Sequence, residues 1–558
     1  MVEILLTQVD IRDTINLLES LLIKFMFFGG KIMNKKWTAG LLISLLMVAG
    51  CGGSGSGDKK AEQKAVTAKD EIVITVGNNL VAGKFDPTIG YGVWNPDIFH
   101  SHIFKVGKGN TLEMDLAVKE TISQDGRVYT YEIRKDGKFA DGKPITAKDV
   151  EFTIKKAMSR PSALDLTMVA DVKALDDTHV EFTLKKPWSS FPYTLTSVGI
   201  VPQHAYTDTY GDRPLGSGAW KIVDFQKGQQ LILAPNEHYY GPKSKFKKIT
   251  ILKMDQDAAL AAAKSGKLDL VLVSAEFAKN EVKDMKKKAY DVTDVFLFNL
   301  PVIQETTENG KKVGNNVTCD PAIRKALNIG ISRKEIINKG LNGYGTPAYT
   351  YARYTPWAST TKFEDGKVEE AKKILSDAGW KDSNGDGIID KNGVNAEFTV
   401  TGRSNDLDRY NTAVAMGEEA KKLGIKINVK SAPWAECRIA RNIPTNWSYG
   451  EADPIGVYRQ YHSSQVDVNK IGNPSTYKNA EVDALLDKAI LSANRDEANK
   501  LWQKALITSE KDVPSLALCS PQNVYFIRDG LQIPDFGKVI TRSQGISIVE
   551  NMNEWTWK

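Results

Sequence analysis

The chain has 558 residues and a formal net charge of +6, with basic and acidic residues interspersed along its length. No block of lysine and arginine resembles a nucleic-acid patch, so we expect no nucleic-acid partner. Beyond Cys51 the cysteines are Cys319, Cys437 and Cys519. Their wide separation excludes a CxxC metal or redox motif and a disulfide framework, and leaves open whether one pair forms a bridge.

Residues 1–32 are unlike the start of an exported protein, because carboxylates occur where an export leader is basic. These are Glu3, Asp10, Asp13 and Glu19. We interpret this segment as a mis-assigned upstream start, with synthesis beginning at Met33. A short amphipathic helix is the alternative.

Residues 33–50 have the layout of a lipoprotein signal peptide: a basic start at Lys35 and Lys36, a charge-free stretch, and small residues before Cys51. The charge-free stretch is shorter than the roughly 20 residues of a membrane-spanning helix. We therefore predict cleavage before Cys51 and lipid attachment to its thiol, which two acyl chains make stable. The alternative is a buried apolar segment that precedes a cysteine.

Residues 51–70 are rich in Gly, Ser, Lys, Ala and Glu, which predicts a flexible tether. The chain beyond it is long enough for two or more domains. Runs of β-branched residues or of alternating polarity predict strands at 71–76, 128–134, 180–184 and 230–233.

Helices are indicated by caps followed by periodic apolar residues. Thr146 opens one helix, and Ser332 with Glu335 forms the pattern of a capping box. Further helices are predicted at 368–378, 407–423, 480–492 and 497–509. Strands and helices alternate along the chain, so the predicted class is α/β with more than one lobe.

Eight short motifs follow one another along the chain: Phe139–Val150, Pro214–Trp220, Asn236–Gly241, Gly266–Asp269, Ile323–Asn328, Ser332–Arg333, Gly343–Ala348 and Ala378–Trp380. In this order they resemble the motifs of bacterial extracytoplasmic solute-binding proteins of family 5, the peptide and nickel group that supplies ABC importers. The resemblance extends from about Glu71 to Ile540. Two departures are Ser332 for the usual Asp, which still caps a helix, and Ala219 for the usual Pro.

The resemblance implies a two-lobed periplasmic-binding-protein type II fold with an inserted subdomain in the first lobe. A solute is enclosed between the lobes when they close. The implied limits are lobe I core at 71–112 and 216–296, inserted subdomain at 113–215, lobe II at 297–514, and a return to lobe I at 515–558.

The resemblance also implies which segments line the cleft. Arg403 follows a predicted strand at 398–400, and its guanidinium is suited to a carboxylate, although a solvated loop arginine has the same sequence pattern. The tryptophans are either cleft walls or core residues. The implied ligand-binding residues are Tyr91, Trp94, Arg160, Arg403, Asn405, Trp434, Trp447, Tyr449 and Asp453.

The segment Trp447–Pro454 resembles the W-x-x-D-Y-x-D-P motif of peptide-binding members, in which the first Asp holds the α-ammonium group. Here Gly450 stands at that position, while Asp453 is kept. Glu451 is adjacent but replaces the tyrosine of the motif. The position that binds a free peptide amine is therefore left open.

Three further segments raise the question of a metal. His462 is a counterpart of the histidine that nickel-carrying members place after the Asp-Pro, or a structural histidine in a polar loop. For His100 and His102 we favour structural roles, since residues i and i+2 of a helix face different ways. Residues 382–390 resemble an EF-hand loop, but Gly393 stands where the bidentate Glu belongs, and we reject calcium.

We expect a lipid-anchored, monomeric receptor outside the cytoplasm, without cofactor or enzymatic activity, that delivers a solute to an ABC permease and ATPase. In a host with two membranes it is periplasmic. Peptide-like solutes and a nickel chelate are the two ligand classes that the resemblance implies. Rival classes are a sensory lipoprotein that does not transport and a secreted hydrolase, although the sequence has no H-E-x-x-H or G-x-S-x-G motif.

Overall fold

The computed structural model describes residues 69–77, 80–81, 83–93, 96–107, 110–450, 452–468, 471–534, 539–540 and 547–558. These residues belong to one compact unit, residues 66–558. The predicted signal peptide, Cys51, most of the tether and Trp94 lie outside the described residues. Within the described part, no helix combines the length and the apolar character that crossing a bilayer requires.

A mixed sheet organises lobe I, in the strand order β11-β1-β10-β9-β8. β1 runs parallel to both β10 and β11, and its residues Ile72 and Ile74 are fully buried. Each such buried side chain contributes about 1.5–3 kcal/mol of hydrophobic free energy. The elements of this part are β1 (Glu71–Thr75), β8 (Trp220–Gln226), β9 (Gln230–Pro235), β10 (Lys248–Leu252), α4 (Gln256–Lys264), β11 (Leu270–Val273), β12 (Met285–Val292), β23 (Leu531–Gln532), β24 (Val539–Ile540) and β25 (Thr556–Trp557).

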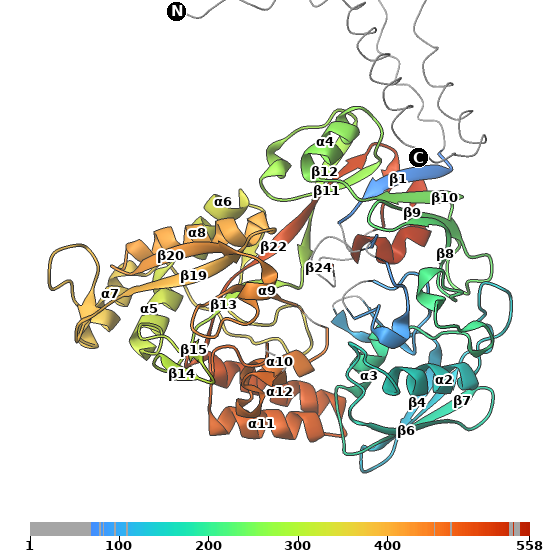
Figure 1. The fold of residues 1–558 in the computed structure, drawn as a ribbon, viewed down its shortest axis with the longest axis horizontal. Coiled ribbons are helices and arrows are strands. Elements are labelled where there is room, and N and C mark those ends of the chain that lie inside the picture. Colours follow the sequence, from blue (N-terminus) through green and yellow to red (C-terminus); the bar gives the residue numbers. More distant parts are fainter. Residues whose placement is uncertain are drawn as a thin grey trace, which may run out of the picture. The chain divides into compact units, whose positions relative to one another are not determined.

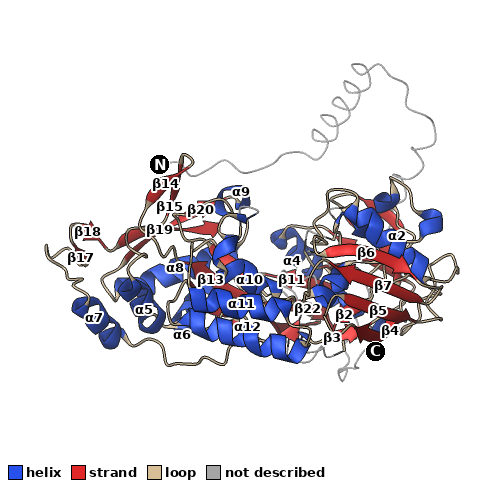
Figure 2. Ribbon diagram, turned by 90° about the horizontal axis from the view of Figure 1, so that it is seen from below, coloured by secondary structure: helices blue, strands red, loops and turns tan. Residues whose placement is uncertain are grey.

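An inserted subdomain contains a separate antiparallel sheet, in the order β4-β5-β7-β6, packed against α2 (Figure 2). β5 alternates buried and half-buried residues, as the sequence predicts. Thr146 caps α2, and its amide and hydroxyl both donate to Asp149 at 2.9 Å. The elements are β2 (Phe104–Val106), β3 (Leu112–Met114), β4 (Ala117–Ile122), β5 (Val128–Ile133), α2 (Ala147–Met158), β6 (Val169–Ala174), β7 (His179–Leu184) and α3 (Phe191–Thr194).

Lobe II packs helices around the parallel pair β19–β20 and around the first half of β22. The predicted helices at 368–378, 407–423, 480–492 and 497–509 are α7, α8, α11 and α12. The elements are β13 (Val295–Asn299), β14 (Thr306–Glu308), β15 (Lys311–Val313), α5 (Pro321–Gly330), α6 (Arg333–Leu341), β16 (Gly345–Pro347), α7 (Val368–Asp377), β17 (Asp390–Lys391), β18 (Val394–Asn395), β19 (Glu397–Arg403), α8 (Leu407–Lys421), β20 (Lys426–Ala432), α9 (Trp434–Cys437), β21 (Asn446–Tyr449), α10 (Ile455–Tyr461), α11 (Ala480–Leu491), α12 (Arg495–Glu510) and β22 (Ser515–Arg528).

The lobes are joined by two crossings of the chain. β12 pairs with the second half of β22 in lobe I, and β13 pairs with its first half in lobe II, so Thr293 and Asp294 form one crossing. β22 is the other, because Ser515–Cys519 pairs with β13 while Val524–Ile527 pairs with β11 (Figure 1). Two crossings permit a hinge motion and limit its direction. The domain limits given above stay a prediction.

Two local predictions differ from the structure. The Ser332 hydroxyl accepts from the Glu335 amide at 3.3 Å, but the Ser332 amide donates to Glu419 of α8. Tertiary packing therefore replaces half of the predicted capping box. His100 and His102 lie in an irregular loop, not on a helix, and both rings approach Asp97, at 2.9 and 3.7 Å. This buried network agrees with a structural role for both.

Candidate ligand-binding site

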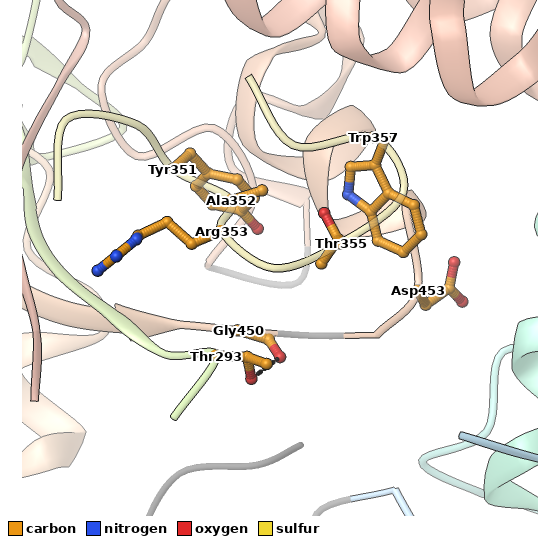
Figure 3. A pocket seen from close by; sticks show the side chains of 8 residues that line it. All are labelled: Thr293, Tyr351, Ala352, Arg353, Thr355, Trp357, Gly450 and Asp453. Atoms are coloured by element: carbon orange, nitrogen blue, oxygen red, sulfur yellow. Dashed lines mark hydrogen bonds between the residues drawn. The ribbon is translucent and has the colours of Figure 1, made fainter. Parts of the chain in front are cut away.

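A small pocket lies where the first crossing meets a lobe II loop (Figure 3). The cavity volume is about 10 Å³, close to the space of a single water molecule. Its walls are Thr293, Tyr351, Ala352, Arg353, Thr355, Trp357, Gly450 and Asp453. A solute of several heavy atoms therefore fits here only when the walls move apart.

At Gly450, directly after β21, the backbone lies against the first crossing between the lobes. The Thr293 hydroxyl donates to the Gly450 carbonyl at 2.9 Å, and the Ser448 hydroxyl donates to Asp294. Because glycine has no Cβ, the two backbones approach closely at this point. The carboxylate that the peptide-binding motif has at this position is replaced by a backbone contact.

Charged side chains of both signs line the pocket. Asp453 precedes α10, and one of its carboxylate oxygens accepts from the amide of Ile455 at 2.9 Å. Arg353 donates to the Thr346 hydroxyl at 2.7 Å and to the Tyr354 hydroxyl at 2.8 Å, which fixes the guanidinium. The pocket therefore combines a carboxylate with a guanidinium, an arrangement suited to a zwitterionic solute.

A row of aromatic rings leads away from the pocket. Tyr351 lies 5.0 Å from Tyr449, and Tyr449 stacks on Trp447 at 5.8 Å. Trp447 contacts Trp434 edge-on at 4.8 Å. Trp447 and Tyr449 share one face of β21 because strand residues two apart point the same way. Trp447 is buried, whereas Trp434 and Tyr449 are half-buried, so the row is partly accessible.

Arg403 ends the row. Its guanidinium carbon lies 5.1 Å from the centre of the Trp434 ring, and its buried Nε has no hydrogen-bond partner. Burial, and then the positive charge of Arg409, lower the pKa of Arg403. Arg409 has its own carboxylate in Asp406, at 3.2 Å, while no ion pair of Arg403 occurs among the described residues. Arg403 is thus a half-buried cation that forms no ion pair among the described residues, although the Asp406 carboxylate is near enough to counteract part of the lowering of its pKa. Exposed Asn405 lies in the same loop.

Two of the predicted site residues are placed elsewhere. Tyr91 lies in the lobe I core, 5.3 Å from Phe85. Arg160 donates to Asp86 at 2.7 Å and to Tyr206 at 2.9 Å. Its charge is neutralised within lobe I, so the structure brings neither residue to the pocket. Their ligand-binding role remains an untested prediction.

His462 ends α10 and faces other residues than those of the pocket. Its ring stacks on Tyr458 at 4.4 Å, its Nδ1 accepts from the Ser464 amide at 3.1 Å, and its Nε2 lies 3.4 Å from Asp487. These contacts match those of a structural histidine. No group of three or more His, Cys, Asp or Glu with metal-binding geometry occurs in the described part of the chain.

The EF-hand-like segment forms a turn that uses its carboxylates internally. Asp382 accepts from the amides of Gly385 and Gly387, at 2.7 and 2.9 Å. Asp390 accepts from the amide and the hydroxyl of Ser383. These oxygens stabilise the turn before β17.

A family model described as bacterial extracellular solute-binding proteins, family 5 Middle, matches residues 111–469. The chain belongs to this family. Its proteins bind solutes outside the cytoplasm as the substrate-binding components of ABC transporters for peptides and nickel, and they are not enzymes.

Among its relatives is the oligopeptide-binding protein AppA of Bacillus subtilis, 28% identical over 542 residues, which covers 90% of this chain and 96% of the relative. Among solved structures, NikZ of Campylobacter jejuni in complex with Ni(L-His) has a TM-score of 0.72 at 24% identity, covering 88% and 99% of the two chains. AppA of B. subtilis in complex with a nonapeptide has a TM-score of 0.66 at 24% identity, with the same coverage. Both confirm the two-lobed family fold.

The sequence analysis missed six of the pocket residues: Thr293, Tyr351, Ala352, Arg353, Thr355 and Trp357. A signal was present, because the family motif Gly343–Ala348 is followed directly by a loop that combines aromatic residues with an arginine. Thr293 carried no signal, since its importance arises from its place at the crossing between the lobes.

Proposed function

We propose that this protein is a lipid-anchored, extracytoplasmic receptor that captures a peptide or peptide-like solute between its lobes and delivers it to an ABC importer. The observation that carries the proposal is Arg403, a half-buried guanidinium that forms no ion pair among the described residues and lies at one end of an aromatic row. Asp453 lines the pocket at the other end. A free α-carboxylate fits the first group, and an α-ammonium fits the second.

The row between these charges suits an extended chain. Its successive contacts, from Arg403 to Tyr351, measure 4.8–5.8 Å. The path is thus roughly 20 Å at most, the length of an extended peptide of about six residues. Aromatic faces accommodate varied side chains without specific hydrogen bonds, which favours a range of short peptides. The similarity to an oligopeptide-binding protein supports the same ligand class.

A nickel chelate is the second candidate, supported by the likeness to NikZ with Ni(L-His). Arg403 and the aromatic row also suit a small chelator that bears carboxylates. In this case His462 is the residue predicted to bind the metal, although its two ring nitrogens face Ser464 and Asp487.

A thermal-shift screen distinguishes the two candidates. The ligands are random tetrapeptide and hexapeptide pools with free termini, the same pools amidated or acetylated, and Ni²⁺ with and without histidine. A ligand at 100 times its Kd adds about 2.7 kcal/mol to the stability of the folded state. In the wild type, we expect the free peptides to raise the unfolding temperature, and amidation of the peptides to reduce this rise. In Arg403→Ala, amidation should not reduce it. The exposed Arg438→Ala is the control. A shift only with Ni²⁺ and histidine would favour the nickel chelate.

We further propose that synthesis begins at Met33 and that Cys51 carries the lipid. Cys51→Ser should release the protein from membranes or leave an unprocessed precursor. An intact mass that fits an unlipidated mature chain in the wild type would contradict this proposal.

Delivery to an importer separates the proposal from a sensory lipoprotein. Deletion of the gene should abolish uptake of a radiolabelled peptide that binds the pure protein, and plasmid-borne wild type should restore it. Unchanged uptake together with an altered transcriptional response would indicate a sensor.

A further inference from the structure

One loop of lobe II contacts the pocket and lobe I at the same time. Residues 351–357, which we call the strap, contribute five of the pocket-lining residues (Figure 3). Asn110 of lobe I donates from its side-chain amide to the Tyr354 carbonyl at 2.8 Å. Tyr193 of the inserted subdomain meets the Trp357 ring edge-on, with centroids 5.5 Å apart.

The strap has an unfavourable backbone conformation at its centre. Tyr354 has a φ of 58°, in the left-handed region that bulky side chains rarely adopt. Such a conformation persists only where the surroundings hold it. Here the holding contacts are the hydrogen bond from Asn110 and the Arg353 guanidinium, which binds the Tyr354 hydroxyl and stacks on its ring at 4.6 Å.

The same pair of lobes is bridged at a second place, on α11 and α12. Ser189 of the inserted subdomain donates from its amide to the Ile490 carbonyl and from its hydroxyl to the Ala489 carbonyl, both at 2.8 Å. Arg495 pairs with Glu120 at 2.9 Å. These contacts form only when the lobes are together, so they report closure independently of the strap.

We propose that the strap couples solute binding to lobe closure. Arg353 and Thr355 line the pocket on either side of Tyr354, so a solute that contacts them also orients the Tyr354 carbonyl. In the left-handed conformation this carbonyl accepts the hydrogen bond from Asn110. A solute that favours this conformation therefore favours closure, and removal of the solute lets the strap relax and release Asn110. The solute part of this inference rests on the proposed function, whereas the link between strap and closure does not.

Hydrogen exchange of the full chain, without solute, tests the link. The readout is the amide of Ser189, whose hydrogen bond spans the two lobes. Asn110→Gly keeps the left-handed backbone (φ 57°) but removes the donor, and we expect exchange at Ser189 to increase about threefold to tenfold, the effect of one lost hydrogen bond. Tyr354→Gly removes the strain and keeps the carbonyl, so exchange should slow or stay unchanged. The matched control is Asn309→Gly, an exposed residue with φ 50° in the β14–β15 turn, which should have no effect.

Unaltered exchange at Ser189 in Asn110→Gly, with β1 protected as in the wild type, would overturn the coupling. If Asn110→Gly does not fold, Trp357→Leu tests the second lobe contact by the same readout, with the same expected increase. A second arm adds the free-terminus hexapeptide pool, which should slow exchange at Ser189 in the wild type and less so in Asn110→Gly. If only this arm fails, the peptide proposal is rejected, and the proposed link between the strap and lobe closure stands.

Discussion

Gly450 lies directly against Asp294, a residue of the first crossing between the lobes. A Cβ added at Gly450 would come within 2.7 Å of the amide nitrogen and of the Cα of Asp294, and nearer still to its carboxylate. Position 450 therefore has no space for a side chain. A carboxylate at this position, as in the peptide-binding motif, would clash with Asp294, and this supports the proposal that Asp453 receives the ligand amine.

Gly450→Ala should destabilise the protein by about 1–3 kcal/mol, because the backbone of Asp294 has to shift to make room. Urea unfolding followed by circular dichroism measures the change. The control is Gly417→Ala in α8, where the added Cβ meets its nearest neighbour at 3.4 Å. That variant should be neutral or more stable, since alanine favours a helix over glycine. Equal effects of the two substitutions would contradict the steric argument.

The stability of the folded state should fall as the pH rises from about 4 to about 7, because Asp408 loses its proton in this range. Burial, and then the nearby Asp406, raise the pKa of Asp408 to about 7, whereas an unfolded Asp titrates near 3.9. Between these values the folded state holds a proton that the unfolded state has lost. The contribution is present below pH 4, is lost by about pH 7, and has a slope of at most about 1.4 kcal/mol per pH unit.

Asp408→Asn should flatten this dependence and raise stability at pH 8. Its side-chain oxygen can still accept from the Ala275 amide, which lies 3.2 Å from Asp408. Chemical denaturation at pH 5 and pH 8 gives the two stabilities. Asp257→Asn, an exposed residue in the first turn of α4, is the control. An identical pH profile for wild type and Asp408→Asn would rule out this assignment.

His462→Ala should lower stability by about 1–2 kcal/mol without altering ligand affinity, because the ring packs on Tyr458 and bonds to Ser464. Calorimetric titration with the best ligand of the screen measures affinity, and thermal unfolding measures stability. The control is His179→Ala, because His179 forms an exposed pair with Asp176. This substitution should change neither stability nor ligand affinity. Loss of a nickel-dependent shift in His462→Ala alone would instead make His462 a metal ligand.

Arg333→Lys should destabilise the protein by about 1–3 kcal/mol, since it keeps the positive charge near Asp365 but leaves buried acceptors without a donor. The Arg333 Nε donates to the carbonyls of Ala348 and Ala517, both at 2.9 Å, and its two terminal nitrogens bind Asn328. A lysine ammonium is too compact to span these acceptors. Guanidinium chloride unfolding measures the loss, with the exposed Lys334→Ala as control. A loss of stability below about 1 kcal/mol would contradict the argument that only a planar guanidinium can reach all of these acceptors.

The sequence predicted several residues of the candidate site, but it did not predict the contacts between them. Arg403, Trp434, Trp447, Tyr449 and Asp453 were predicted from the family resemblance, and the structure places them along one row that ends at the pocket. Arg353 and Trp357 were missed because they belong to a loop without a recognisable motif. Their role follows from Asn110 and Tyr193, which lie far away in the sequence.

The sequence by itself determined five of the strands, six of the helices, the cap at Thr146 and the family. Each of these depends on residues within a few positions of one another, or on motifs that retain their order. Only the tertiary structure decided which arginine is available to a ligand. Arg160 and Arg403 both lie in polar segments next to regular elements and have the same intrinsic chemistry. Folding brings the Asp86 carboxylate into an ion pair with Arg160, whereas it places the Trp434 ring against Arg403, which forms no ion pair among the described residues. Whether a buried arginine gains an ion pair depends on partners that are distant in the sequence, and short-range sequence patterns carry no information about them.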